Sequence, residues 1–422
     1  MSDNYDILTA RTDDSLLVRF IQGILFSMKY IMVVPDGAAD EPLESLSGST
    51  PLQSAITQNI DTLTITGRVG AAEVTPPDMY PGSDAANMAL LGYNPVEYYT
   101  GRGPVEAAAL NVPMSVSDVA FRCSLISTDG YRLLDYSSGH ITTEEAAILI
   151  DFANQELGTD RIQLFPGISY RHILRWTGGD PYMSASLPHE NMGKLLSEIY
   201  PTGAEDNVLR RFITQSFSIL NTHPVNVRRR REGKNPANML WPWGPGKSPA
   251  LPPFQQIRGM SGAVVAAVDV VKGLGRLAGL EVPEVPGATG YFDTDYASKA
   301  NTALEALKRH DFVWIHVEAP DEAGHLGSLK EKILAIENID RLVIGTLLEN
   351  LHNKVDFRLL CVPDHKTPLA RKGHSIGPVP YLLYDSRKAL NGGSSHPFDE
   401  RILDKNIPPV EGFHLIEHLF DA

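Results

Sequence analysis

Acidic and histidine side chains follow three of the predicted strands in this chain. They are Asp36 after the apolar run 30–35, Asp321 and His325 after the run 312–317, and Asp364 and His365 after the run 356–363. In an open α/β sheet, the crevice beyond the carboxyl ends of the strands is where ligands bind, so these side chains are expected to converge. Crowded carboxylates repel one another, and bound cations relieve that repulsion. The pattern therefore predicts a metal site.

His374 and Ser83 extend this set of donors. Carboxylate, imidazole and hydroxyl groups, without cysteine, suit two divalent ions, and Mn²⁺, Zn²⁺ and Mg²⁺ each fit parts of the set. The predicted ligands are Asp36, Ser83, Asp321, His325, Asp364, His365 and His374. A metal ion would lower the pKa of the Ser83 hydroxyl, so the chemistry indicated is phosphoryl transfer through a covalent serine intermediate.

Ser83 lies just before a helical pattern at 85–91. Free backbone N–H groups at a helix N-terminus favour an anion such as phosphate. An ordinary capping serine is the alternative for this segment taken alone, and the metal set favours the nucleophile. Arg102 is flanked by glycines in a predicted loop, and its guanidinium group is well suited to hold a phosphate or carboxylate. The alternative is a turn in which this arginine is solvated.

Size and charge limit the class of protein. The chain has 422 residues and a formal net charge of −14, which argues against a general binder of nucleic acid or anionic membranes. The two cysteines, Cys123 and Cys361, form no CxxC motif or disulfide framework, so a cytoplasmic location is expected. Residues 1–27 are acidic where a signal peptide would be basic, and are interpreted as an extension or an upstream start.

The chain order predicts an α/β protein with a doubly wound sheet domain and a smaller inserted α/β domain. Residues 28–113 and 236–422 are assigned to the sheet domain and 114–235 to the insertion. Within the insertion we expect a hairpin around Asp129-Gly130, a helix from about Thr143 to Leu157, a strand pair in 162–176 and an amphipathic helix at 207–220. The four arginines at 228–231 and the Pro- and Gly-rich segment 235–253 are interpreted as a solvated charge run and a linker.

Two segments of the chain partly match nucleotide-binding motifs. Residues 272–278 loosely fit the GxGxxA fingerprint of dinucleotide-binding dehydrogenases. Residues 244–248 end like a Walker A loop, but Trp241 stands where the first glycine is needed. A dehydrogenase would also not require the metal-ligand set.

Several longer motifs resemble the alkaline phosphatase superfamily, and within it the archaeal-type cofactor-independent phosphoglycerate mutases. The resemblance covers nearly all of the chain after Met28. The motifs are Val34-Pro35-Asp36-Gly37, Pro81-Gly82-Ser83-Asp84, Tyr99-Thr100-Gly101-Arg102-Gly103-Pro104, Asp118-Val119-Ala120-Phe121-Arg122-Cys123, the segment 318–325 and Pro363-Asp364-His365.

The resemblance implies a role for each matching position. Ser83 would be phosphorylated transiently, Asp36, Asp364 and His365 would share one metal ion with it, and Asp321, His325 and His374 would hold the second. The insertion would act as a cap. Residues implied to face the substrate are Arg102, Arg122, Arg171 and Lys272, with His140 or His172 as a proton carrier. The implied reaction, part of glycolysis and gluconeogenesis, interconverts 3- and 2-phosphoglycerate with Mn²⁺ and without 2,3-bisphosphoglycerate.

Alternatives remain open at this stage. The segment 241–247 replaces an arginine-glycine pair of similar mutases and resembles a subgroup proposed to act as homoserine kinases, which would need a nucleotide motif that is not found. A phosphomonoester hydrolase would not need a cap to retain its substrate. A binding protein without activity is disfavoured because every implied ligand is present. The expected partner is a small phosphorylated anion, and the oligomeric state is left undetermined.

Overall fold

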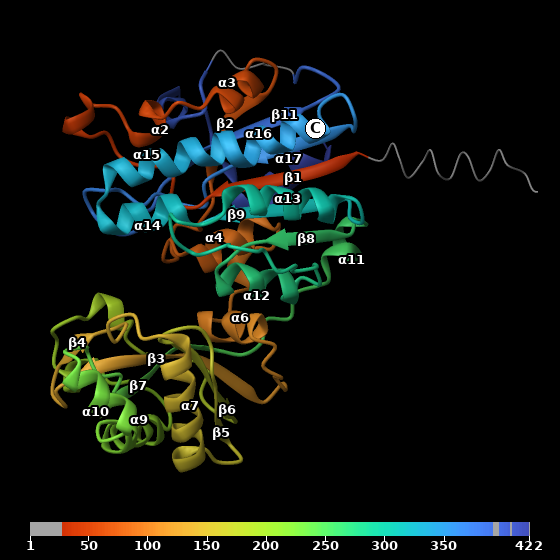
Figure 1. The fold of residues 1–422 in the computed structure, drawn as a ribbon. Helices are drawn as coiled ribbons and strands as arrows, with labels where there is room; N and C mark the ends of the chain where they lie inside the picture. The colour runs from red at the N-terminus through yellow and green to blue at the C-terminus, as the bar shows by residue number, and fades with distance from the viewer. Residues whose placement is uncertain (1–27, 391–395, 406, 422) are drawn as a thin grey trace, which may run out of the picture.

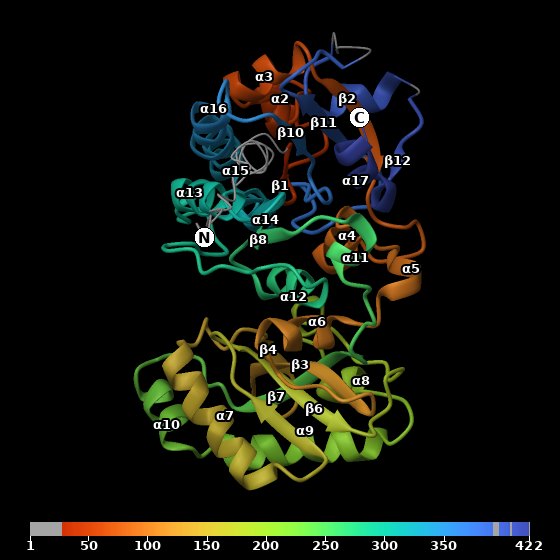
Figure 2. The ribbon, with the colours of Figure 1, turned by 90° about the vertical axis from the view of Figure 1, so that its right-hand side faces the viewer.

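A computed structural model describes residues 28–390, 396–405 and 407–421. The predicted N-terminal extension, 1–27, lies outside this part of the chain. Two layered bodies, each built on its own sheet, lie one above the other (Figures 1 and 2). No helix in the described ranges combines the length and apolar character needed to cross a membrane.

The larger sheet has seven strands in the order β12-β2-β11-β10-β1-β9-β8. Its strands are β1 (Lys29–Pro35), β2 (Arg68–Glu73), β8 (Gly262–Val265), β9 (Phe312–Val317), β10 (Phe357–Cys361), β11 (Val379–Asp385) and β12 (Val410–Glu411). The strands β8, β9, β1 and β10 are parallel, whereas β11 runs antiparallel to both neighbours. The parallel strands that end in the predicted ligands are therefore adjacent.

Both faces of this sheet are covered by helices. Ile31 and Val33 of β1 belong to the core on one face, and Met32 and Val34 to the core on the other, as alternation along a strand requires. The first face packs on α3 (Gln58–Thr64), α13 (Tyr296–Leu307), α15 (Leu329–Asn338) and α16 (Gly345–Leu351), and the second on α4 (Ser83–Leu90), α11 (Phe254–Arg258), α12 (Asp269–Leu277) and α17 (Gly412–Asp421). The doubly wound α/β prediction is confirmed, with a mixed sheet.

Short elements complete this body. A π-helical segment, Ile339–Ile344, joins α15 to α16. The others are η1 (Glu44–Leu46), α2 (Pro51–Ser54), α5 (Pro95–Tyr98), α14 (Ala319–Leu326) and η4 (Glu400–Lys405).

The smaller sheet is antiparallel, in the order β4-β3-β6-β5, with β7 paired to β3. It contains β3 (Asp118–Thr128), β4 (Leu133–Asp135), β5 (Ile162–Phe165), β6 (Arg171–Thr177) and β7 (Met239–Gly246), with α7 (Thr143–Leu157), α8 (Leu196–Ile199), α9 (Asp206–Leu220) and α10 (Pro224–Arg231) around it. The predicted hairpin, strand pair and two helices are confirmed. Thr142 caps α7 by accepting a hydrogen bond from the Glu145 N–H.

The predicted linker is wrong, and the predicted charge run holds for three of its four arginines. Eight residues of the segment 235–253 form β7, whose side chains Leu240, Trp241 and Trp243 are buried in the smaller core. The arginines lie in α10, where Arg229 is buried and bonded to Glu145 and the other three are exposed. The domain boundaries themselves remain a prediction, and the smaller sheet extends past residue 235.

Helix α6 (Arg102–Ala109) forms the joint between the two bodies (Figure 2). On one side, an added Cβ at Gly103 would stand 2.3 Å from the Ala120 carbonyl oxygen in β3; on the other, one at Gly273 of α12 would stand 1.9 Å from the Val105 carbonyl oxygen. Side chains larger than hydrogen are excluded at both contacts. Since Gly273 lies inside α12, the predicted GxGxxA segment is a packed helix and not a phosphate-binding turn.

Candidate active site

The carboxyl ends of β1, β9 and β10 bring two groups of potential metal ligands together. The first ligand group is Asp36, Asp364 and His365, and the second ligand group is Asp321, His325 and His374. Within each group, one donor atom from every member lies within 4.8 Å of the others. The rings of His365 and His374 have centroids 4.0 Å apart, so the two groups are adjacent.

The first ligand group is buried and tightly bonded. His365 Nε2 lies 3.4 Å from Asp36 Oδ1 and 3.7 Å from Asp364 Oδ2. The other oxygen of Asp364 accepts hydrogen bonds from the backbone N–H groups of Gly37, at 3.1 Å, and His365, at 3.0 Å. These bonds fix the carboxylate beside the imidazole.

The second ligand group spans a helix and a loop. Asp321 and His325 are on one face of α14, as their spacing predicts, with Asp321 Oδ2 3.3 Å from His325 Nε2. His374 Nε2 lies 3.4 Å from Asp321 Oδ1 and 3.1 Å from His325 Nε2. Two imidazole nitrogens that face each other need a proton or a cation between them.

The electrostatics of both groups fit cations. Burial, followed by the charges of Asp364 and Asp321, raises the pKa of Asp36. Asp36 Oδ1 is a buried oxygen for which the described residues supply no hydrogen bond. Burial would lower the pKa of His325, but the hydrogen bond and charge of Asp321 outweigh it and raise this pKa to about 9. Divalent ions would satisfy these donors without the protons.

Ser83 adjoins the first ligand group. It is the first residue of α4, with Gly82 at the N-cap, and its hydroxyl lies 3.1 Å from His365 Nε2. The hydroxyl makes no capping bond within α4. The unpaired N–H groups of the first turn and the helix dipole favour a phosphate at this position.

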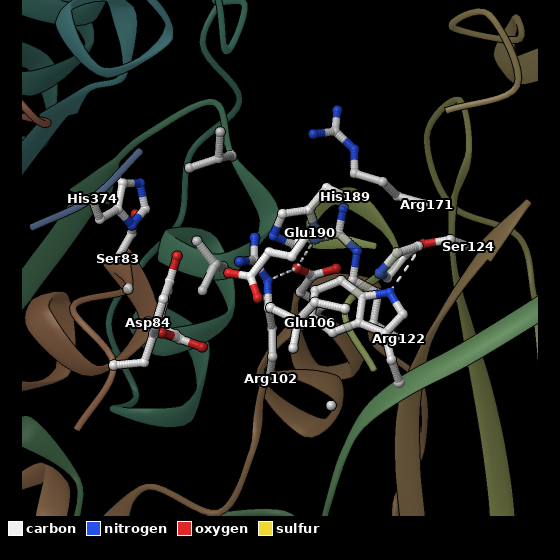
Figure 3. Close-up of a pocket in the computed structure, with 18 of the residues that line it drawn as sticks. Ser83, Asp84, Arg102, Glu106, Arg122, Ser124, Arg171, His189, Glu190 and His374 are labelled. Carbon is white, nitrogen blue, oxygen red and sulfur yellow. Dashed lines mark hydrogen bonds and ion pairs between the residues drawn. The ribbon is translucent and has the colours of Figure 1, made fainter. Parts of the chain in front are cut away.

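A cavity of about 860 Å³ extends from these ligands to the smaller sheet. Ser83 and His374 lie at one end, and Arg122, Arg171 and Ser124 at the other (Figure 3). Both bodies of the protein therefore contribute to one site.

A carboxylate organises the arginine end. Glu106 of α6 accepts, on one oxygen, a bond from Arg102 Nε at 2.6 Å and one from Arg122 Nη1 at 2.6 Å. Burial would raise the pKa of Glu106, but Arg122 and Arg102 lower it to about 2, so the carboxylate is ionised. Arg102, Arg122 and Arg171 thus lie around one ionised carboxylate, and Glu190 and Asp269 also line the cavity.

The indole of Trp243 supports the same arginines. The guanidinium carbons of Arg102 and Arg122 lie 5.7 Å and 5.0 Å from its ring centre, within the range of cation–π attraction. Its N–H donates to Ser124 Oγ at 3.0 Å. The segment that departs from the arginine-glycine pair of similar mutases thus supplies an aromatic support for arginines from elsewhere.

The sequence-predicted substrate residues separate into two sets. Arg102, Arg122 and Arg171 line the cavity, although Arg102 begins α6 and is not in a loop. His140, His172 and Lys272 are not among the lining residues. His172 is buried in β6, where its Nδ1 accepts a bond from the Gly167 N–H at 3.0 Å.

Sequence reasoning missed several residues of the cavity wall. They include Glu106, His189, Glu190, Trp243 and Glu322. His189 lies in the short helix η2 (Pro188–Glu190) and projects into the middle of the cavity (Figure 3). Glu322 directly follows Asp321 within the quoted motif, which is the one sequence signal that could have indicated it.

The fold and site define a class: an α/β protein with two candidate metal sites beside a serine at a helix N-terminus. A family model described as 2,3-bisphosphoglycerate-independent phosphoglycerate mutase matches residues 65–226. The chain is 43% identical over 392 residues to the protein of that name from Methanosarcina acetivorans, covering 92% of this chain and 98% of that one. It is 46% identical over 400 residues to 2,3-bisphosphoglycerate-independent phosphoglycerate mutase 2 of Methanothermobacter thermautotrophicus, covering 94% and 98%. The chain belongs to the 2,3-bisphosphoglycerate-independent phosphoglycerate mutase family, which confirms the resemblance.

Solved structures agree with this assignment. A protein from Pyrococcus horikoshii, 30% identical, has a TM-score of 0.78 with 94% of this chain and 97% of that chain covered. The cofactor-independent phosphoglycerate mutase from Thermoplasma acidophilum, 27% identical, has a TM-score of 0.60 with 93% and 99% covered.

Proposed function

We propose that this chain interconverts 3-phosphoglycerate and 2-phosphoglycerate without 2,3-bisphosphoglycerate, through a phosphoserine at Ser83. The observation that carries the proposal is the position of the Ser83 hydroxyl, 3.1 Å from His365 Nε2 in a cavity that also contains the arginines. Family membership supports the mutase reaction, and the geometry supports Ser83 as the residue that is phosphorylated.

Two divalent ions complete the proposed site. Asp36, Asp364, His365 and Ser83 would hold one ion, and the second ligand group the other; Mn²⁺ is the first choice, with Zn²⁺ or Mg²⁺ as alternatives. When bound, such ions lower the pKa of a serine hydroxyl and neutralise charge on phosphoryl oxygens.

The reaction takes two transfers. Ser83 Oγ loses its proton and bonds to phosphorus as the bond from phosphorus to O3 of the substrate breaks, and O3 takes up a proton to leave glycerate. Glycerate reorients within the cavity. Its O2 then loses its proton and bonds to the same phosphorus as the bond to Ser83 Oγ breaks, and Ser83 regains a proton. Protons and phosphate balance over the cycle.

We assign the proton transfers at glycerate to His189. Burial, then the positive charges of Arg102 and Arg122, lower the pKa of His189 to about 4, so its imidazole is neutral when no substrate is bound; the negative charges of a bound phosphate and carboxylate would raise this pKa and let the ring accept and return a proton. Its place between Ser83 and the arginines suits contact with a reorienting hydroxyl (Figure 3). The earlier candidates, His140 and His172, lie outside the cavity lining.

The arginine end would hold the glycerate carboxylate. Arginine binds carboxylates in a forked geometry, and Glu106 fixes two of the three guanidinium groups. Membership of the mutase family, and the failure of both nucleotide motifs in the sequence, favour the mutase over the kinase alternative.

The test is a side-by-side assay of the purified protein. With Mn²⁺ and 3-phosphoglycerate alone, we expect formation of 2-phosphoglycerate, measured by coupling to enolase. Parallel reactions contain ATP with homoserine, and 3-phosphoglycerate with detection of released inorganic phosphate. Transfer to homoserine without mutase turnover would establish the kinase, and phosphate release alone would establish a hydrolase.

We also propose a cytoplasmic location. Cys123 and Cys361 are buried free thiols, which suits a reducing compartment. Cell fractionation with an antibody against the protein would test this directly.

A further inference from the structure

A line of buried side chains lies behind the first ligand group and has no part in the mechanism above. It consists of Lys299 in α13, Glu318 directly after β9, and His316 in β9. Their relative exposures are 0%, 2% and 0%. Taking a lysine and a glutamate fully out of water is costly unless each is paired and bonded, so their contacts are informative.

The inner end of the line is fully bonded. Lys299 Nζ donates to Glu318 Oε2 at 2.5 Å and to the His316 carbonyl oxygen at 2.8 Å. Glu318 Oε1 accepts from the backbone N–H groups of Ala267 and Val268, at 3.1 and 3.2 Å, and lies 3.4 Å from His316 Nδ1. These contacts determine how the imidazole is oriented.

The outer end of the line faces the metal ligands. His316 Nε2 lies 3.6 Å from Asp36 Oδ2 and 3.7 Å from Asp364 Oδ2. Asn87 Nδ2 lies 3.3 Å from the same nitrogen and donates to Asp364 Oδ2 at 2.7 Å. Strand pairing explains the placement, because His316 is the register partner of Val34, two residues before Asp36. One imidazole nitrogen thus faces two carboxylates whose charges repel each other.

We propose that Lys299, Glu318 and His316 are positioning residues that fix Asp36 and Asp364 and set the affinity of the first ligand group for its divalent ion. The proposal rests on the proposed function only in assuming that this group binds a metal. Residues that orient metal ligands typically contribute 10–100-fold to metal affinity. In the described residues the side chains of this line contact Asp36 and Asp364, whereas the second ligand group meets only the Glu318 backbone, whose carbonyl accepts the Asp321 N–H at 3.1 Å. Changes of these side chains should therefore act on the first site.

A purely structural ion pair is the competing explanation, since Lys299 and Glu318 also join α13 to the end of β9. The two roles separate in a double variant, Lys299→Met/Glu318→Gln, which removes both charges together and leaves no unpaired buried charge. His316→Asn tests the outer end of the line independently. The matched control is Arg358→Met/Asp385→Asn, which removes a buried ion pair at the opposite end of β10.

The experiment measures Mn²⁺ binding to the EDTA-stripped full chain by calorimetry, with thermal unfolding in EDTA as the check on folding. Wild-type protein should bind two Mn²⁺ ions. In the double variant and in His316→Asn, one of the two sites should weaken by roughly 10–100-fold while the other is unchanged. At saturating Mn²⁺, KM for 3-phosphoglycerate should stay at the wild-type value. The control variant should retain both affinities.

Unchanged affinity at both sites in the folded variants would overturn the proposal, as would equal weakening in the Arg358→Met/Asp385→Asn control. Wild-type protein that binds no Mn²⁺, or other divalent ion tested alongside, would overturn it together with the metal part of the proposed function. Wild-type protein that binds two ions but does not convert 3-phosphoglycerate would overturn the proposed function alone.

Discussion

The metal end of the cavity takes its candidate ligands from loops and a helix that follow the strands of one sheet, whereas the arginine end takes its side chains from α6 and from the smaller sheet. Strand pairing fixes the first set, because β1, β9 and β10 are adjacent and parallel. The second set is fixed by the packing of two bodies and by one shared carboxylate, Glu106. Under the proposed function, phosphoryl transfer depends on one sheet, and recognition of the substrate depends on the contact between the two bodies.

Removal of the Ser83 hydroxyl should cause the largest loss of turnover, and it tests the metal end of the cavity separately from the arginine end. Ser83→Ala should lower turnover of 3-phosphoglycerate by at least about 10⁴-fold, because the other hydroxyl beside the first ligand group, that of Thr367, is buried, bonded to Asp321 and outside the cavity lining. Mn²⁺ binding should persist. Turnover and calorimetry measure the two properties.

The matched control for this variant is Ser124→Ala at the arginine end, where the hydroxyl accepts a bond from Trp243. Ser124→Ala should lose far less turnover than Ser83→Ala. Comparable losses in the two serine variants would contradict the assignment of Ser83 as the nucleophile.

His189→Gln should come next, with a fall in kcat of about 10²-fold and little change in KM, as expected for loss of a general acid–base. Steady-state kinetics with saturating Mn²⁺ measure this split. His140→Gln, in a histidine outside the cavity lining, should match wild type. A wild-type kcat in His189→Gln would show that a group other than His189 transfers the proton.

Glu106→Gln should weaken substrate binding at the arginine end and leave metal binding at the other end unchanged. Loss of the carboxylate leaves Arg122 buried without its charged partner, so KM should rise about tenfold and the free energy of unfolding should fall by roughly 3 kcal/mol. Mn²⁺ affinity should not change.

The control is Glu145→Gln, which removes a carboxylate held by Arg228 and Arg229 on the far side of the smaller sheet. It should lower stability and leave KM unchanged. A rise in KM in both variants would show that Glu106 acts through stability alone.

The smallest effect at neutral pH concerns His172. Burial, with Arg122 nearby, lowers the pKa of His172 to about 3, whereas an unfolded chain has a value near 6.5. The unfolded state therefore binds a proton first, and the free energy of unfolding should fall as pH drops from about 6.5 to about 3, by on the order of 4 kcal/mol. Urea titrations at several pH values should show a shallower fall in His172→Gln. Identical slopes would contradict a neutral, buried imidazole.

Most of the candidate metal ligands could be predicted from the sequence because patterns of neighbouring residues indicate them. Asp36 and the pair Asp364-His365 follow recognisable strands, and Asp321 and His325 lie one helical turn apart. His374, in a loop, and Ser83, at the start of a helix, gained their assignment from the company of the others and from the family resemblance. The arginine end could be predicted only in part. Glu106 and Trp243 acquire their roles from contacts between elements distant in sequence, and β7 was interpreted as a linker because its prolines and glycines hide a strand that pairs with β3.

Local structure around Arg102 shows the same limit. Its flanking glycines suggested a loop, yet Gly101, at φ +136°, directly precedes the helix that Arg102 begins. Pro104 is compatible with this because the first turn of a helix tolerates proline. Arg102 lines the cavity, its role toward the substrate stays a prediction, and the predicted loop around it is wrong.

The close packing of α6 has a consequence for protein engineering. Its backbone touches β3 through Gly103 and α12 through Gly273, at separations that leave no room for a side chain. A chimaera that exchanges the smaller body with that of a relative should therefore place its first crossover ahead of Gly101, so that the donor's own helix accompanies its sheet. The donor helix must then present to Gly273 a backbone of the same shape, which makes that glycine the position to inspect first when parents are chosen.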